Sequence, residues 1–378
     1  MSSGSAGHGD EHLEHIQECL ELAAKARGDT GSNPLVGAVV VASGAVIGRG
    51  YHRRCGDPHA EQVALVQAGG KARGGTLYTN VEPCCHQGRT PPCVDAIIAA
   101  GVGTVVASHS DPDERVDGRG FEALRTAGIE VLVGPLAAEA AELNAAYLKL
   151  KRTGRPLVVA KAAVSLDGRM ATRTRGSQWI TGEEARDFAH QVRGTVDAVV
   201  VGIGTLLDDD PRLTARVPGA HPPRYRAVVD ARLETPADAK LLQETAGVPL
   251  IVTTGAADAG ARRHLEARGA QTVEVQATPS GRVDLDEMLV RLGDLEVASI
   301  LLEGGSALLT SAFELGIIDK VMLFYAPLLI GGQEALPLWG GDGVAELASA
   351  PRVQRVRLHR LGSDWAIEGY LQPPELPA

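Results

Sequence analysis

The chain has 378 residues, of which 44% are hydrophobic, and a formal net charge of −10 at neutral pH. This length suggests two or three domains, and the hydrophobic content suffices for buried cores, which excludes a disordered chain. The acidic balance and the absence of a basic run argue against a nucleic-acid partner, because phosphate binding requires clustered Lys and Arg.

Cysteine usage and hydropathy indicate a soluble protein of a reducing compartment. The five cysteines are an odd number and do not suggest a disulfide framework. No apolar run is long enough for a membrane span, and the polar N-terminus lacks the apolar core of a signal peptide. We therefore expect a cytoplasmic location.

The first part of the chain alternates helices and strands. Its Gly/Ser-rich start, with His8, His12 and His15, is expected to form a mobile tail without function. Hydrophobic periodicity predicts helices over 13–25, 59–68, 92–101, 120–126 and, as one helix, 136–149. Strands are predicted over 35–41, 45–47, 75–81, 103–108 and 129–133. This pattern predicts a sheet covered by helices, with the candidate metal ligands at helix starts.

A short basic segment over 151–156 is predicted to form a turn, and a new strand follows over 157–163. We place the domain boundary there, with one domain over residues 1–150 and a second over 155–375. The second half again alternates strands with helices, which predicts another α/β domain. Its strands are predicted over 198–201, 225–229, 250–253, 299–302 and 320–326, and the pattern between 256 and 296 is weak.

The segment from His59 to Cys93 carries the residues of a zinc-activated water site. It contains His59-Ala60-Glu61 and the run EPCCHQGRTPPC, which starts at Glu82. His59, Cys84 and Cys93 can bind one zinc ion and leave its fourth position for water, whose pKa the metal can lower to about 7. Glu61 can move protons without binding the metal. Nucleobase deaminases use this arrangement, with a non-ligand glutamate as general acid and base.

Alternatives remain open at this motif. The prolines and the glycine before Cys93 could belong to a purely structural zinc site, which has no need of Glu61. Cys85 could replace its neighbour Cys84 as the ligand. His86 could orient a substrate or simply close the loop.

In the second half, glycine-rich turns follow predicted strands. Gly202-Ile203-Gly204 is weak evidence for a dinucleotide site, because Leu207 stands where the fingerprint has its third glycine. Gly304-Gly305-Ser306 follows the strand 299–302 and precedes a predicted helix. Glycines let the backbone approach a phosphate, and a helix N-terminus offers free N–H donors. This turn is therefore predicted to bind phosphate, and the alternative is an ordinary tight turn.

The chain resembles the bifunctional riboflavin-biosynthesis deaminase/reductases. The resemblance rests on motifs in family order: NPLVG from Asn33, the zinc motif with eight residues between Cys84 and Cys93, SLDG from Ser165, SQWIT from Ser177, DDPRLT from Asp209 and LLEGGSALL from Leu301. It implies an α/β protein with an N-terminal cytidine-deaminase-like domain of three α/β/α layers. The C-terminal α/β domain would be like dihydrofolate reductase. The implied cofactors are Zn²⁺ and NADPH.

The resemblance also implies two successive reactions. The first domain would deaminate a diaminopyrimidine ribosylamino 5′-phosphate with Glu61 as proton carrier, and the second would reduce the ribosyl group to ribityl with NADPH. The residues implied to contact the cofactor are Ala163, Trp179, Thr205, Asp209, Gly304, Gly305 and Ser306. Those implied to hold the substrate are Ser177, Arg193, Leu213, Arg216 and Glu303. The candidates for proton handling are Lys161, Asp209 and Glu303.

One position departs from the family pattern. Where the family commonly has DPNP, this chain has Asp111-Pro112-Asp113-Glu114. Asp113 is therefore expected to alter a hydrogen bond and to add negative charge near a phosphorylated substrate.

Two other functions remain possible from the residues. One is a nucleoside or transfer-RNA deaminase with an accessory nucleotide-binding domain, which the acidic charge disfavours. The other is a zinc-stabilised regulator that binds NADPH without turnover. For the leading function we expect a small-molecule substrate, no nucleic-acid or membrane partner, and a homo-oligomer.

Overall fold

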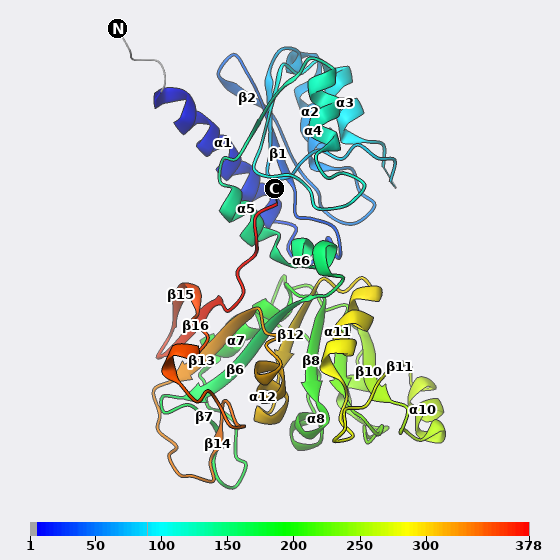
Figure 1. Ribbon diagram of the computed structural model, residues 1–378, viewed down its shortest axis with the longest axis vertical. Helices are drawn as coiled ribbons and strands as arrows, with labels where there is room; N and C mark the ends of the chain where they lie inside the picture. The colour runs from blue at the N-terminus through cyan, green and yellow to red at the C-terminus, as the bar shows by residue number, and fades with distance from the viewer. Residues whose placement is uncertain (1–5, 89, 378) are drawn as a thin grey trace. The chain divides into compact units, whose positions relative to one another are not determined.

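The structure is a computed structural model that describes residues 6–88 and 90–377. The described chain folds into two compact units (Figure 1). One contains the residues up to Thr153 together with 374–377, and the other contains Gly154–Pro373. No helix of the described chain is long and apolar enough to cross a membrane.

The first unit is built on one five-stranded sheet. Its strands are β1 (Gly37–Ala42), β2 (Ala45–Tyr51), β3 (Thr76–Thr79), β4 (Thr104–Ala107) and β5 (Glu130–Val133), in the spatial order β2-β1-β3-β4-β5. β1 pairs antiparallel with β2 and β3, whereas β3, β4 and β5 are parallel. The loops that follow β3 and β4 therefore leave the sheet at the same edge.

Helices cover both faces of this sheet (Figure 1). They are α1 (Ala6–Ala24), α2 (Ala60–Ala68), α3 (Cys93–Ala100), α4 (Arg119–Thr126), α5 (Ala137–Leu143) and α6 (Ala145–Thr153), with a 3-10 turn η1 (Gly69–Ala72) after α2. Ala38 and Val40 of β1 pack in one cluster with α2, α3 and α4, whereas Val39 and Val41 pack with α1. Alternate side chains of a strand point to opposite faces, so the apolar run of β1 serves both helical layers.

Three details of the first unit differ from the sequence predictions. The predicted helix over 136–149 is two helices with Asn144 between them, and the side chain of Asn144 bonds both the N–H and the C=O of Leu35, at 2.7 and 3.0 Å. The predicted turn over 151–156 starts later, since α6 continues to Thr153. The expected tail is the helix α1, in which Nδ1 of His12 lies 3.0 Å from the hydroxyl of Tyr78. The side chain of His8 lies outside the described residues.

The second unit contains a nine-stranded sheet in the order β11-β10-β9-β8-β12-β6-β13-β16-β15. The strands are β6 (Leu157–Ser165), β8 (Ala198–Gly202), β9 (Tyr225–Val229), β10 (Val248–Thr254), β11 (Gln271–Val275), β12 (Ser299–Glu303), β13 (Lys320–Ala326), β15 (Gln354–Leu361) and β16 (Asp364–Tyr370). All neighbours from β11 to β13 are parallel, and β16 and β15 continue the sheet antiparallel. β7 (Arg169–Ala171) and β14 (Leu336–Pro337) form a separate pair.

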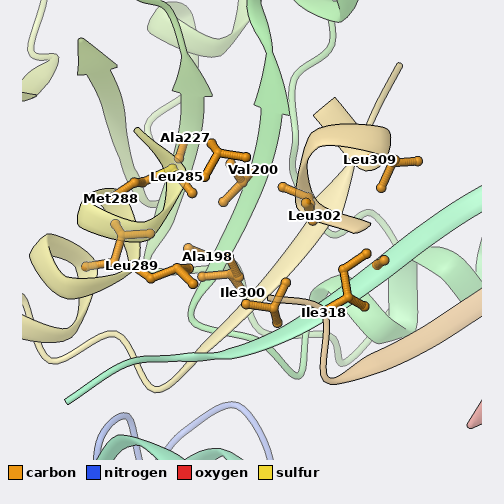
Figure 2. Packing of buried hydrophobic residues seen from close by; sticks show 14 of the residues in the cluster. Ala198, Val200, Ala227, Leu285, Met288, Leu289, Ile300, Leu302, Leu309 and Ile318 are labelled. Atoms are coloured by element: carbon orange, nitrogen blue, oxygen red, sulfur yellow. The ribbon is translucent and has the colours of Figure 1, made fainter. Parts of the chain in front are cut away.

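Two apolar clusters enclose the parallel part of this sheet. The helices are α7 (Glu183–Arg193), α8 (Ile203–Asp209), α9 (Lys240–Gln243), α10 (Ala259–Glu266), α11 (Leu285–Asp294) and α12 (Ser306–Glu314), with a 3-10 turn η2 (Leu347–Ser349). Figure 2 shows side chains of β8, β9 and β12 packed against Leu285, Met288 and Leu289 of α11 and Leu309 of α12. The other face packs against α7 and α8. Because both faces of β12 are covered, all five of its residues are buried.

The region over 256–296, where the sequence pattern is weak, contains α10, β11 and α11. The hairpin of β15 and β16 was not predicted. Most of β15 is exposed, and its sequence QRVRLHRL lacks the continuous apolar run of a buried strand.

The functionally important feature of the second unit is the carboxyl edge of β8 and β12. The chain passes there from β8 into α8 and from β12 through Gly304 and Gly305 into α12. Open α/β sheets bind ligands at such an edge.

Candidate active sites

The first site lies in the first unit, where the candidate metal ligands converge. His59 is the N-cap of α2, Cys93 is the first residue of α3, and Cys84 lies in the loop after β3. Nδ1 of His59 is 3.4 Å from Sγ of Cys84 and 3.3 Å from Sγ of Cys93, and the three ligand atoms lie within 4.8 Å of one another. Ligands of one tetrahedral zinc ion are about 3.5–4 Å apart. This set fits zinc, and it makes up the zinc-binding site of the protein.

Neighbouring groups orient His59 and favour the thiolate form of Cys84. Oγ1 of Thr90 lies 3.1 Å from Nε2 of His59 and fixes the ring with Nδ1 toward the thiols. Hydrogen bonds with Cys93 and then His59 lower the pKa of Cys84 to about 4, which favours the thiolate form that binds metal. Cys85 is not a ligand, because its Sγ points to the carbonyl oxygen of Arg115, at 3.5 Å. The alternative with the two cysteines exchanged is therefore excluded.

Glu61 stands beside the ligands in the first turn of α2. Its side chain is buried, and among the described residues its Oε2 has no hydrogen-bond partner. Burial, and next the neighbouring Cys84, raise the pKa of this carboxyl. A buried carboxylate oxygen without a partner is costly in a purely structural site. The same atom is available to a water molecule or a substrate, which fits proton transfer.

Sequence reasoning missed the role of Glu82, which precedes the cysteine loop. Its carboxylate accepts backbone N–H groups of Asp111, Gly118, Gly120 and Phe121, at 3.0, 3.0, 2.8 and 3.2 Å. Glu82 thus fixes the loop between β4 and the start of α4. A Cβ on Gly120 would lie 2.2 Å from the carbonyl oxygen of Pro83, so only glycine fits at this approach. The only sequence signal was an acidic residue at the end of a strand.

Asp113, the residue that departs from the family pattern, pairs with two cationic side chains of the same unit. Its carboxylate accepts from Nε and Nη2 of Arg115, at 2.9 and 2.7 Å, and Nζ of Lys151 lies 3.0 Å away. The hydrogen bonds from Arg115 hold the pKa of Asp113 well below its ordinary value. The negative charge that Asp113 adds is therefore balanced by cations of the protein itself.

The second site is a cavity of about 910 Å³ in the second unit. It receives residues from β6, α7, α8, the segment after α8 and the end of β12. Of the residues that the resemblance assigned to this half, all but Ser306 line it: Lys161, Ala163, Ser177, Trp179, Arg193, Thr205, Asp209, Leu213, Arg216, Glu303, Gly304 and Gly305. Ser306 is buried at the start of α12.

Glu303 is the electrostatic centre of this cavity. Both of its oxygens are engaged, by Nε of Arg193 at 2.7 Å and by Nη2 of Arg193 at 2.9 Å, and Nζ of Lys161 lies 3.4 Å away. Burial by itself would raise the pKa of Glu303, but the charges of Arg193 and Lys161 lower it well below its ordinary value. Glu303 is therefore ionised at neutral pH and holds two cations at the cavity wall.

The glycine turn after β12 is packed against α8. The N–H of Gly305 donates to Oγ1 of Thr205 at 2.8 Å, and Gly304 has a φ of 134°. A Cβ on Gly304 would lie 3.0 Å from the same Oγ1. The turn is thus a close backbone approach at the N-terminus of α12, a geometry that suits the phosphate groups of a dinucleotide.

Trp179 and Asp209 lie on another part of the cavity wall. Trp179 is 68% exposed, so it is not the core residue that an isolated tryptophan usually is, and its ring is free to contact a ligand. The guanidinium of Arg186 lies 5.0 Å from the ring centroid. Asp209 accepts from Nε2 of Gln178 at 3.2 Å. These residues and the glycine turn fit NADPH.

His190 is a second residue that sequence reasoning missed. It lines the cavity between Arg193, one helical turn further along α7, and Arg216. The available signal was its spacing of three residues from Arg193, which places both on one face of a helix.

Two family models match the chain. Residues 10–109 match the cytidine and deoxycytidylate deaminase zinc-binding region, and residues 156–367 match the RibD C-terminal domain. Among curated proteins, the riboflavin biosynthesis protein RibD of Aquifex aeolicus is 41% identical over 353 residues, which are 93% of this chain and 96% of that protein. The RibD protein of Actinobacillus pleuropneumoniae is 38% identical over 352 residues, 93% of each chain.

Two solved structures have a similar fold along 96% of this chain. Acinetobacter baumannii RibD, form 1, has a TM-score of 0.87 and 34% identity, and the match covers 96% of this chain and 99% of that one. The diaminohydroxyphosphoribosylaminopyrimidine deaminase/5-amino-6-(5-phosphoribosylamino)uracil reductase of Thermotoga maritima has a TM-score of 0.83 and 31% identity, with the same coverage.

Proposed function

Because this chain belongs to the RibD family of bifunctional riboflavin-biosynthesis deaminase/reductases, we propose that it acts on 2,5-diamino-6-ribosylamino-4(3H)-pyrimidinone 5′-phosphate in two steps. Residues 1–150 carry the deamination, and residues 155–375 then reduce the ribosyl group to ribityl. The membership confirms the resemblance inferred from the motifs.

In the deaminase, His59, Cys84 and Cys93 would hold zinc, which when bound lowers the pKa of a coordinated water and makes it nucleophilic. Glu61 takes the proton of the attacking water on its unpartnered Oε2 and passes it to the leaving amino group. Glu82 keeps the opposite loop in place through its four backbone hydrogen bonds. Ammonia leaves, and the pyrimidine keeps its ribosylamino phosphate.

In the reductase, the chemistry that NADPH would supply when bound is a hydride for C1′ of the sugar, and the ring oxygen released by opening would need a proton. Lys161 is the proton donor in this proposal, because its side-chain nitrogen lines the cavity and lies 3.4 Å from Glu303. Glu303 stays ionised and keeps Lys161 and Arg193 in position. Arg193 and Arg216 face the sugar phosphate, for which a planar guanidinium is suited.

The remaining cavity residues divide between cofactor and substrate. The residues that would hold NADPH are Ala163, Trp179, Thr205, Asp209 and the turn 304–306, whereas Ser177 and Leu213 would contact the substrate.

We also propose that the enzyme is a cytoplasmic homo-oligomer. No disulfide joins any of the five cysteines, all of which belong to the described chain, and thiolate zinc ligands suit a reducing compartment. The exposed edge strand β15, with Val356 56% and Leu358 66% exposed, supports association with a second subunit.

The observation that carries the proposed function is the buried carboxylate of Glu61 beside the zinc ligands, whose Oε2 has no partner among the described residues, together with a separate ligand cavity in the second unit. Mass spectrometry of the pyrimidine product tests it. Zinc-replete protein incubated with the diaminopyrimidine ribosylamino phosphate should exchange NH for O without cofactor. Addition of NADPH should then add two hydrogens. An unchanged substrate in both reactions would show that this chain uses a different substrate.

A further inference from the structure

His190 lies in the last turn of α7 and lines the reductase cavity, and both of its ring nitrogens have partners. Nδ1 lies 3.1 Å from the carbonyl oxygen of Thr214. Nε2 lies 3.1 Å from Nη2 of Arg216. Thr214 and Arg216 belong to the segment after α8, so His190 joins this segment to α7.

The chemistry of the two partners decides which ring nitrogen carries the proton. A carbonyl oxygen can only accept, so Nδ1 carries the hydrogen and donates it to Thr214. A guanidinium can only donate, so Nε2 carries no hydrogen and accepts from Arg216. Nη1 of Arg193 lies farther from Nδ1, at 3.4 Å, and itself donates to the carbonyl oxygen of Thr214 at 3.2 Å. The contacts of the ring with Thr214 and Arg216 are therefore satisfied together only by the neutral imidazole with its proton on Nδ1.

Arg216 differs from its neighbours in the cavity. Arg193 is held by Glu303, and Arg212 pairs with Glu244. Among the described residues, no carboxylate pairs with Arg216, whose guanidinium contacts His190. Arg216 therefore offers its remaining N–H groups and its full positive charge to an anionic ligand.

We propose that His190 is a positioning residue of the reductase, whose neutral imidazole accepts from Arg216 and directs that guanidinium at the phosphate of the sugar-phosphate substrate. The proposal rests on the proposed function. Without the acceptor at Nε2, the long arginine side chain is free to adopt other rotamers, and ordering it costs binding free energy. His190 thus affects the affinity for the phosphorylated substrate without touching the reacting carbon.

The surroundings of His190 keep it in the accepting form. Burial, and then the charges of Arg193 and Arg216, lower the pKa of His190 to about 4. Arg193 faces the ring from the same helix and Arg216 from the segment after α8, and the opposing effect of Glu303, at the end of β12, is smaller than theirs. The imidazole is therefore neutral at the pH at which the reductase would be assayed.

Steady-state kinetics of three variants of the full-length, zinc-replete protein test the proposal. His190→Asn retains a donor near the Nδ1 position and loses the acceptor for Arg216. His190→Gln retains an acceptor near the Nε2 position, and Arg216→Gln removes the guanidinium itself. NADPH oxidation is followed with the deaminated ribosylamino phosphate and with the same compound after removal of its phosphate.

For His190→Asn we expect the KM of the phosphorylated substrate to rise about 10-fold, the low end of the loss of a hydrogen bond to a charged group. Its kcat and its KM for NADPH should stay at the wild-type values. The KM of the dephosphorylated substrate should not change, and His190→Gln should restore most of the affinity. Arg216→Gln should raise the KM of the phosphorylated substrate at least as much as His190→Asn.

The outcomes separate this proposal from the proposed function. If the wild type reduces neither compound, the proposed function fails, and the inference fails with it. If the wild type is active and Arg216→Gln raises the KM but His190→Asn does not, the proposed function stands and the role of His190 is wrong. A His190→Asn variant that weakens both substrates and NADPH equally, with a lower melting temperature, has lost structure, and this result also overturns the proposal.

Discussion

Two buried glutamates have different roles because their surroundings differ. Glu303 has both oxygens engaged by Arg193 and lies near Lys161, so it is a fixed charge that holds cations. Glu61 is buried as deeply, yet its Oε2 has no partner among the described residues. An unengaged carboxylate oxygen can gain and lose a proton without breaking a protein contact. Glu61 is therefore the residue suited to proton transfer.

Replacing Glu61 by Gln tests this difference. The amide keeps the shape of the side chain but cannot accept a proton, so we expect the rate of ammonia release to fall roughly 10²–10⁴-fold. Zinc content by elemental analysis and NADPH-dependent reduction of deaminated substrate should be unchanged. Glu122→Gln, at an exposed position of α4, is the matched control and should behave as wild type. Deamination at the normal rate by the Glu61 variant would contradict the assigned role.

At the scale of elements, the loop between β4 and α4 is stabilised by buried acidic groups rather than by an apolar core. Asp111 accepts from the hydroxyl of Tyr147 at 2.6 Å and from the N–H of Asp113 at 2.9 Å. Burial outweighs these hydrogen bonds and raises the pKa of Asp111 to about 6. The folded protein therefore keeps a proton on Asp111 at a pH where the unfolded chain, with an Asp pKa of about 3.9, has lost it.

This shift predicts a pH dependence of stability. Between pH 4 and pH 6 the folded state binds more protons than the unfolded state, so the contribution of Asp111 to stability falls as the pH rises through this window. Asp111→Asn does not titrate. Its free energy of unfolding relative to wild type should therefore rise by roughly 2 kcal/mol from pH 4 to pH 6 and level off by about pH 7. Denaturant unfolding at a series of pH values measures it.

Asp113→Asn is the control for that prediction, because the pKa of Asp113 is lowered rather than raised. The stability that its ion pairs contribute is present above the unfolded pKa of about 4 and is lost only at lower pH. Because the charge of Asp113 also contributes to the raised pKa of Asp111, the difference between this variant and wild type should change between pH 5 and pH 6, but much less than that of Asp111→Asn. A flat difference for Asp111→Asn would show that Asp111 is ionised in the folded protein.

At the scale of the whole molecule, the two sites belong to separate compact units. The zinc ligands lie in the first unit, and the described residues that line the reductase cavity all belong to the second unit, Gly154–Pro373. The residues of each site are held by contacts within their own unit. The two activities should therefore respond separately to the loss of one cofactor.

Chelation of zinc should abolish deamination and lower the melting temperature of the first unit, because a bound metal stabilises only the folded state. NADPH-dependent reduction of deaminated substrate should persist. NADPH at 100 times its Kd should stabilise the second unit by roughly 2.7 kcal/mol. Calorimetry with and without each cofactor checks both effects. Loss of reductase activity on chelation would contradict independent sites.

The sequence by itself determined the zinc ligands, the candidate base and the two α/β halves. His59 and Glu61 are two residues apart, Cys84 and Cys93 lie nine positions apart, and buried strands such as β12 contain a continuous apolar run, so these signals are local in the chain. Only the tertiary structure decided how distant side chains pair. Arg193 meets Glu303 across 110 positions, and Glu82 holds a loop that starts at Asp111. Such contacts depend on which strand ends meet at one sheet edge, and the periodicity of any single segment does not contain that information.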